Sequence, residues 1–191
     1  MAKNDYEPSH LETLDRDLGR LSALERATSY ASRPMMGLGV SLAFIILAGL
    51  IAFYLFGNTG NTVVVVIAAG LGAYMALNIG ANDVANNMGP AVGANALSMG
   101  GAIAIAAIFE SAGALLAGGD VVSTVAKGII APENMRTTAI FIFAMLSALL
   151  SAALWVNLAT WVGAPVSTTH SVVGGVMGAG IAAAGFAAVN W

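Results

Sequence analysis

Charged residues become rare in this chain after its first 33 residues. Residues 34–191 contain only six: Asp83, Glu110, Asp120, Lys127, Glu133 and Arg136. Five apolar runs occupy the same region, at 35–56, 62–79, 97–118, 137–162 and 172–188. A helix needs about 20 mostly apolar residues to cross a bilayer. The sequence therefore predicts an all-α polytopic membrane protein with about five transmembrane helices. It excludes an ordinary soluble domain, because only 9% of the residues are charged.

The first 33 residues differ from the rest. They hold five of the seven basic residues, together with leucines that recur every three or four positions, as at Leu11, Leu14 and Leu18. This spacing predicts an amphipathic helix. Basic residues beside the first span favour a cytoplasmic N-terminus. We therefore expect a cytoplasmic arm at 1–33, a transmembrane domain at 34–191 and a location in the cytoplasmic (inner) membrane.

A first polar cluster interrupts the apolar sequence at residues 80–89. It contains four polar side chains, Asn82, Asp83, Asn86 and Asn87. Polar groups are costly in hydrocarbon, so such a cluster predicts a functional site. Gly80 weakens the preceding helix, and Asn82 or Asp83 is a good N-cap for a new one. The pattern predicts a broken helix here. The alternative is a structural kink with hydrogen-bonding asparagines.

A second polar cluster follows at residues 165–170. Pro165 disfavours helix at the residue before it, and Ser167, Thr168 and Thr169 are good caps for a following helix. The start of that helix would present N–H groups and a positive dipole end to an anion. His170 is a further candidate to bond a substrate. The alternatives are that the hydroxyls bond back to their own helix and that His170 makes a structural hydrogen bond.

The charges suggest what such a site would bind. No Lys or Arg lies within an apolar run, whereas Asp83 and Glu110 do lie at or inside them. These carboxylates would repel a bound anion, and a cation between carboxylate and anion removes the conflict. Oxygen ligands suit a hard cation, so Na⁺ is a candidate at Asp83. For Glu110 the alternative is a hydrogen bond that packs two helices.

The motifs resemble those of a known family. Residues 80–86 (GANDVAN) and 165–170 (PVSTTH) look like the two signature motifs of the inorganic phosphate transporter (PiT) family. Phe109-Glu110 followed by Gly113 is similar to the intramembrane glutamate segment of that family. The resemblance implies symport of inorganic phosphate with Na⁺ or H⁺, with no other cofactor, in an inverted-repeat fold. It also implies roles for individual residues. Phosphate would be contacted by Asn82, Asp83, Ser167, Thr168 and Thr169. The coupling cation would be bound by Asp83, Asn86 and Glu110, and the accessory residues would be Asn87 and His170.

The chain contains one copy of each motif, whereas the resemblance implies two. It looks like an N-terminal half preceded by an extra helix at 35–56 and the arm. We therefore expect a fragment, a chain completed by a partner chain, an antiparallel homodimer, or a shortened protein that no longer transports. The alternative functions are a non-transporting membrane subunit or regulator, and a carrier of another oxyanion such as sulfate. The sequence predicts neither an enzyme nor a nucleic-acid partner.

Overall fold

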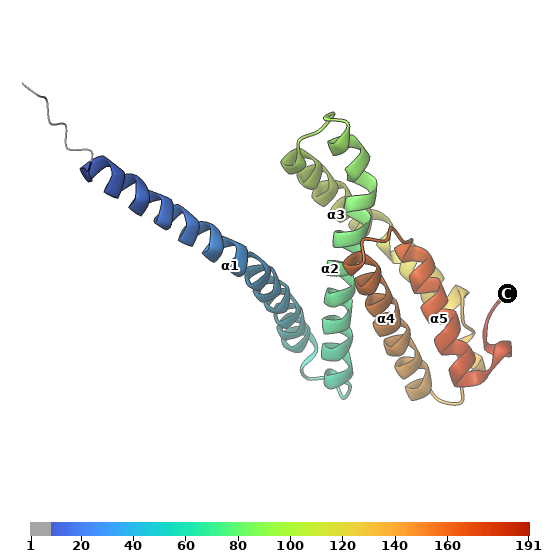
Figure 1. The fold of residues 1–191 in the computed structure, drawn as a ribbon. Coiled ribbons are helices and arrows are strands. Elements are labelled where there is room, and N and C mark those ends of the chain that lie inside the picture. The colour runs from blue at the N-terminus through green and yellow to red at the C-terminus, as the bar shows by residue number, and fades with distance from the viewer. Residues whose placement is uncertain (1–8) are drawn as a thin grey trace, which may run out of the picture. The chain divides into compact units, whose positions relative to one another are not determined.

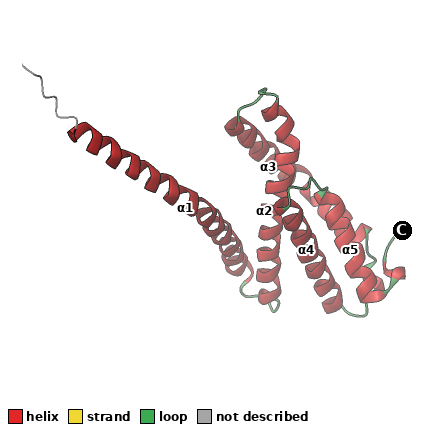
Figure 2. Ribbon diagram, viewed as in Figure 1, coloured by secondary structure: helices red, strands yellow, loops and turns green. Residues whose placement is uncertain are grey.

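The structure, a computed structural model, describes residues 9–191, without the side chains of 9–13, 15, 17, 21–34, 126, 127 and 134. Helices make up almost all of this part of the chain (Figure 1, Figure 2). The five long helices are α1 (Ser9–Phe56), α2 (Thr62–Gly93), α3 (Met99–Ser123), α4 (Thr138–Trp161) and α5 (Thr168–Ala184). Among the described residues the only β-type pairing is an isolated bridge between Ile130 and Val189. The all-α prediction is confirmed.

Four helical segments are long and apolar enough to cross a membrane. They are Met35–Phe56 within α1, and all of α2, α3 and α4. The fifth predicted run forms α5, which has 17 residues and lies at the lower limit of about 17–25 residues for a spanning helix. The structure therefore provides four clear spanning candidates and one shorter helix.

The chain divides into two compact units, at 1–44 and 45–191. Helix α1 contributes to both, and its backbone is helical without interruption from Ser9 to Phe56. No loop separates the predicted arm at 1–33 from the predicted transmembrane domain at 34–191, and that division stays a prediction. The second unit contains both polar clusters.

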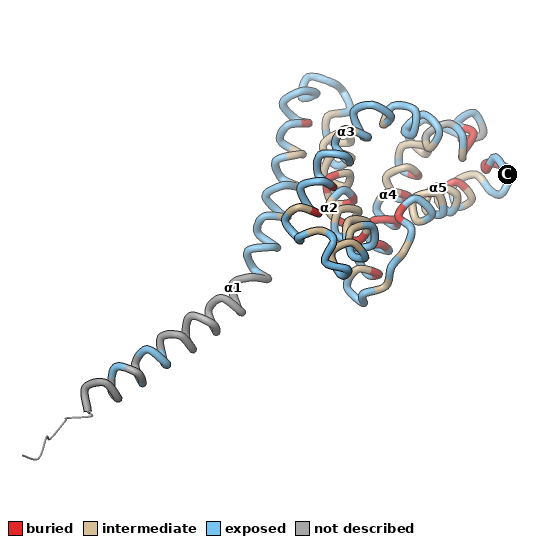
Figure 3. Tube along the Cα trace, turned by 90° about the horizontal axis from the view of Figure 1, so that it is seen from above, coloured by how far each residue is buried: buried red, intermediate tan, exposed pale blue. Residues whose placement is uncertain are grey.

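Within the second unit α2 and α4 run parallel, and α5 packs antiparallel against α4 (Figure 1). Two small clusters of buried residues form the core. One joins Met75 of α2 to Ala152, Ala153 and Val156 of α4, and the other surrounds Ile130 beside α4 and α5. Buried positions gather where α2, α4 and α5 meet, while outward-facing positions are exposed (Figure 3). Close packing through small residues is typical of helices in membranes.

The predicted break at Gly80 is wrong, because α2 continues as one helix from Thr62 to Gly93. Neither Asn82 nor Asp83 caps a new helix, since both side chains bond to residues far along the chain. Pro90 lies in the last turn of α2, where it cannot donate to the Asn86 carbonyl, and the helix ends three residues later. The glycine alone weakens a helix by only about 1 kcal/mol, which tertiary contacts can exceed.

The predicted break at the second cluster is confirmed. Helix α4 ends at Trp161, residues 162–167 are not helical, and α5 begins at Thr168. Gly163 has a φ of 72°, a left-handed conformation that favours glycine. Ser167 is the N-cap of α5, as its residue type predicts. This turn brings the second cluster back beside α2.

Candidate functional site

The two polar clusters are joined by one short hydrogen bond. The Thr168 hydroxyl donates to Asp83 Oδ2 at 2.6 Å, across 85 residues of sequence. Thr168 is 7% exposed and Asp83 is partly buried. The bond connects the middle of α2 to the first residue of α5. The clusters, which are separate in the sequence, therefore form one site.

Asn82 holds the non-helical turn between α4 and α5 against α2. Its Nδ2 donates to Thr160 Oγ1 at 3.1 Å and to the Ala164 carbonyl at 3.4 Å. Its Oδ1 accepts from Asn86 Nδ2 at 2.9 Å and from the Val166 N–H at 3.5 Å. The side chain is 4% exposed, and these four contacts use its two donors and its two acceptor positions. Asn82 thus sets the position of the second cluster relative to Asp83.

The start of α5 is organised by Ser167. Its hydroxyl accepts from the His170 N–H at 3.2 Å and lies 2.7 Å from His170 Nδ1. The Ser171 hydroxyl donates to the Ser167 carbonyl at 2.8 Å. His170 therefore makes a local structural hydrogen bond, which the sequence analysis gave as the alternative to bonding a substrate. Thr169 is exposed, and its side chain makes no hydrogen bond among the described residues.

Two predicted site residues lie apart from this network, and a third lies at its edge. Glu110 on α3 is exposed, and no hydrogen bond or ion pair within the described part of the chain joins it to either cluster. Asn87 is also exposed and has no such contact. Asn86 is exposed as well, but it reaches Asn82 by a hydrogen bond. The structure thus assembles Asn82, Asp83, Asn86 and the start of α5, and leaves Glu110 and Asn87 outside.

Sequence reasoning missed a second pair of amides. Asn78 is 5% exposed, and its Oδ1 accepts from Asn157 Nδ2 of α4 at 2.9 Å. Both residues lie inside runs that the sequence analysis treated as apolar. The signal was present, because Asn78, Asn82 and Asn86 recur every four residues and so lie on one face of a helix. That face of α2 carries an amide stripe toward α4.

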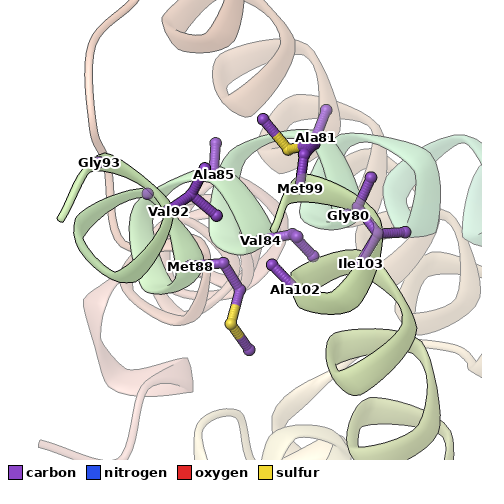
Figure 4. Close-up of a pocket in the computed structure, with 11 residues that line it drawn as sticks. Gly80, Ala81, Val84, Ala85, Met88, Val92, Gly93, Met99, Ala102 and Ile103 are labelled. Carbon is purple, nitrogen blue, oxygen red and sulfur yellow. The ribbon is translucent and has the colours of Figure 1, made fainter. Parts of the chain in front are cut away.

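Two of the cavities beside α2 flank the first polar cluster and have different linings. A cavity of about 110 Å³ is bordered by Asn82, Asn86 and Thr160, together with the backbone turn at 163–165. A larger one, of about 690 Å³, lies between α2 and α3 and is lined by apolar side chains such as Val84, Met88 and Ile103 (Figure 4). An anion needs hydrogen-bond donors, which the larger cavity does not offer. The smaller, polar cavity is the one that belongs to the site.

The site has little positive charge of its own. Helices α2, α3, α4 and α5 contain no Lys or Arg, and Asp83 is the only carboxylate in the two clusters. A bound anion would have to rely on hydroxyls, amides and the N-terminal end of α5. Asp83 would act as the ligand of a positive ion. The arrangement suits a joint site for an anion and a cation.

Comparisons with known proteins agree with this chemistry. The family model described as the phosphate transporter family matches residues 79–191. A protein of Helicobacter pylori named "Putative phosphate permease" is 52% identical over 176 residues, which is 92% of this chain and 33% of the relative. A relative from Thermococcus kodakarensis with a similar name is 46% identical over 127 residues, 66% of this chain and 31% of the relative. A solved structure described as a sodium-dependent phosphate transporter matches with a TM-score of 0.59 and 40% identity, covering 78% of this chain and 32% of the other. The chain spans about a third of the length of these proteins.

Proposed function

We propose that this chain, which belongs to the phosphate transporter family, binds inorganic phosphate together with Na⁺ or H⁺ and takes part in their symport across the cytoplasmic membrane. The family is one of transporters and not of enzymes, and the chain is a multi-pass membrane protein. One observation carries the proposal. The Thr168–Asp83 hydrogen bond sets a carboxylate directly beside the start of α5. This supports a joint site, because a carboxylate can bind a cation and the start of a helix suits an anion.

Phosphate would be held at the start of α5. The first N–H groups of a helix have no intrahelical partner and carry the positive end of its dipole. Thr169 adds an exposed hydroxyl there, and Ser167 and Thr168 hold the turn in place. Thr168 is bonded to Asp83, so it would have to turn its hydroxyl toward phosphate when the ion binds. Asn82 supports the same turn through its three contacts with residues 160–166.

The coupling cation would be held at Asp83. Two like unit charges at 4 Å repel by roughly 4 kcal/mol at an effective dielectric constant of 20. Phosphate beside an ionised Asp83 is therefore unfavourable until Na⁺ lies between them or a proton neutralises the carboxylate. Asn86 offers a further amide oxygen nearby through its contact with Asn82. Binding of phosphate and cation would in this way depend on each other, as symport requires.

This chain would supply one half of the complete site. It contains one copy of each motif and covers a third of the length of its permease relatives. Asn86, Asn87, Thr169 and Glu110 are exposed polar residues on otherwise apolar helices. Polar side chains that face lipid are unfavourable, so these four would face the other half of the site. That half would come from a further segment, a partner chain or a second copy of this chain.

Binding and uptake together test the proposal. The purified chain would be placed in lipid nanodiscs and in liposomes, and the binding and uptake of labelled phosphate would be measured with and without Na⁺ or a proton gradient. We expect cation-dependent phosphate binding that excess sulfate does not abolish. Uptake should appear when the chain is co-reconstituted with the part of the Helicobacter pylori permease that it does not cover. Folded protein without cation-dependent phosphate binding would contradict the proposal.

Uptake by this chain alone, driven by either gradient, would show that copies of it assemble a complete site. Absence of uptake alone, with binding retained and uptake restored by the complementary part, would show that another chain segment supplies the second half. The orientation of the N-terminus is a separate part of the proposal. Its cytoplasmic position is checked by protease access to residues 1–33 in sealed inside-out and right-side-out vesicles.

A further inference from the structure

The hydrogen bond between Asn78 and Asn157 lies directly next to the site but belongs to neither signature motif. Asn157 Nδ2 donates to Asn78 Oδ1 at 2.9 Å, and Asn78 Nδ2 donates to the Tyr74 carbonyl at 2.9 Å. Asn78 is buried, at 5% exposure. The bond therefore has a defined direction and geometry, and it joins the buried Asn78 of α2 to Asn157 at an exposed position of α4.

This pair lies one helical turn from the site on both helices. Asn78 precedes Asn82 by four residues on α2, and Asn157 precedes Thr160 by three on α4. Since α2 and α4 run parallel, the Asn78–Asn157 bond and the Asn82–Thr160 bond form successive rungs between them. A slip of α4 by one turn, about 5.4 Å, would carry Thr160 and the turn that follows it away from Asn82 and Asp83.

The apolar packing between α2 and α4 combines adaptable, small and branched side chains. Its core sets Met75 against Ala152, Ala153 and Val156, with larger partly buried side chains such as Leu149 packed against it. Met is adaptable and alanine is small, so the shape constraint on the register comes from Val156 and its larger neighbours. A directional polar pair in an apolar interface is a known means of fixing helix register. The amide pair adds to this packing a bond that forms at one register only.

We propose that Asn78 and Asn157 are positioning residues that fix the register of α4 against α2 and thereby hold the start of α5 beside Asp83. This inference rests on the proposed phosphate-binding function. The pair acts through Asn82 and Thr160, with no contact of its own to phosphate or cation. Its loss changes the placement of the site more than it changes the stability of the fold.

The decisive comparison is between the single variant Asn157→Leu and the double variant Asn78→Leu/Asn157→Leu. The single variant leaves a buried amide oxygen without its partner and should lower the thermal stability. The double variant replaces both amides by apolar groups of the same branching, which is often nearly neutral for stability. We expect the double variant to recover stability but to bind phosphate at least tenfold more weakly. Asn190→Leu is the control, because it removes one amide hydrogen bond, to the Gly128 carbonyl, away from the site.

Register is measured separately from binding. The chain has no cysteine, so Val63→Cys on α2 and Leu158→Cys on α4 give a unique pair of exposed sites for spin labels. The labels lie far apart along the helix axis, so a slip changes their distance by about 1.5 Å per residue. We expect a narrow distance distribution without further substitution, and a shifted or broadened one in the double variant. If the double variant does not fold, the single variant Asn157→Leu is used for the same spin-label distance measurement, because it changes only an exposed position.

An unchanged distance distribution in the double variant would overturn the proposal. So would a changed distribution with unchanged phosphate affinity, or recovery of affinity together with stability. If the unsubstituted chain binds no phosphate, the proposed function fails, whereas the spin-label distances still decide whether the pair fixes the register.

Discussion

The two polar clusters both carry hydrogen-bonding side chains but have opposite effects on the backbone. The cluster at 80–89 lies in the unbroken helix α2, and its amides and carboxylate reach sideways to α4 and α5. The cluster at 165–170 lies in a turn and a helix start, where Ser167 bonds back to its own helix. The difference lies in the hydrogen-bond partners. Asn82 and Asp83 bond to side chains of other helices, whereas Ser167 bonds to the backbone of its own helix.

The comparison shows how one site combines a rigid and an adaptable part. The helix presents Asp83 at a fixed position, because its backbone bonds are satisfied internally. The turn leaves backbone N–H groups at the start of α5 without carbonyl partners in the helix. The position of the turn depends on its hydrogen bonds with Asn82. We infer that the cation side of the site is the rigid part and that the anion side is the part able to move.

The largest effect is expected from Asp83→Asn. The amide keeps an oxygen that can accept from Thr168, so the fold should persist, but it loses the negative charge that would hold the cation. Charge-assisted hydrogen bonds and ion contacts contribute about 1.5–3 kcal/mol. We expect Na⁺-dependent phosphate binding to fall by about 10- to 100-fold, measured by equilibrium binding in nanodiscs. Asp120→Asn, at the far end of α3, is the matched control, and equal losses in both variants would contradict the assignment.

Asn82→Ala should have the largest effect on stability. It removes three contacts between α2 and residues 160–166 and one with Asn86 within α2. With roughly 0.6 kcal/mol for each hydrogen bond in a membrane protein, the expected loss is about 2–3 kcal/mol. Thermal unfolding in detergent measures it. Asn61→Ala is the control, because the Asn61 side chain makes no capping bond at the start of α2. A destabilisation no larger than that of the control would show that the turn is held by other contacts.

The sequence predicted the second cluster better than the first, for a physical reason. Pro165 and Ser167 act on the backbone next to them, so their effect can be derived from local preferences. Asn82 and Asp83 act on residues about 80 positions away. The two clusters were expected to form one site from their polarity and from the family resemblance, but neither predicted the bonds that join them. Gly80 suggested a break because its local preference was considered without these distant bonds.

The amides of Asn78 and Asn157 show a second limit of prediction from sequence. Asn78 and Asn157 are single polar residues inside apolar runs, where composition hides them. Their four-residue and three-residue spacing from Asn82 and Thr160 was visible, but only the structure shows that α2 and α4 run side by side in parallel. The location of Glu110 outside the network could not be derived from sequence either, since it depends on how far α3 extends away from α2.

A smaller effect is expected from Ser167→Ala. The substitution removes the cap that accepts from the His170 N–H and lies beside His170 Nδ1. Loss of an N-cap costs about 1 kcal/mol. If the turn is the adaptable part of the site, phosphate affinity should fall more than Na⁺ affinity, which equilibrium titrations of each ion would show. Ser98→Ala removes the equivalent cap of α3, away from the site, and serves as the control. An equal change in both affinities would contradict the division into rigid and adaptable parts.

The smallest effects, of opposite sign, are expected from two glycine substitutions that compare the clusters directly. Gly80 lies inside α2, and a Cβ there would meet no atom within 4 Å, so Gly80→Ala should stabilise the chain by about 0.5–1 kcal/mol. Gly163 also has open space, but its φ of 72° is unfavourable for alanine, so Gly163→Ala should destabilise it by about 1 kcal/mol. Thermal unfolding of both variants provides the measurement. Destabilisation by Gly80→Ala would indicate that α2 does break at the first cluster, because only a non-helical backbone at residue 80 would make alanine unfavourable in open space.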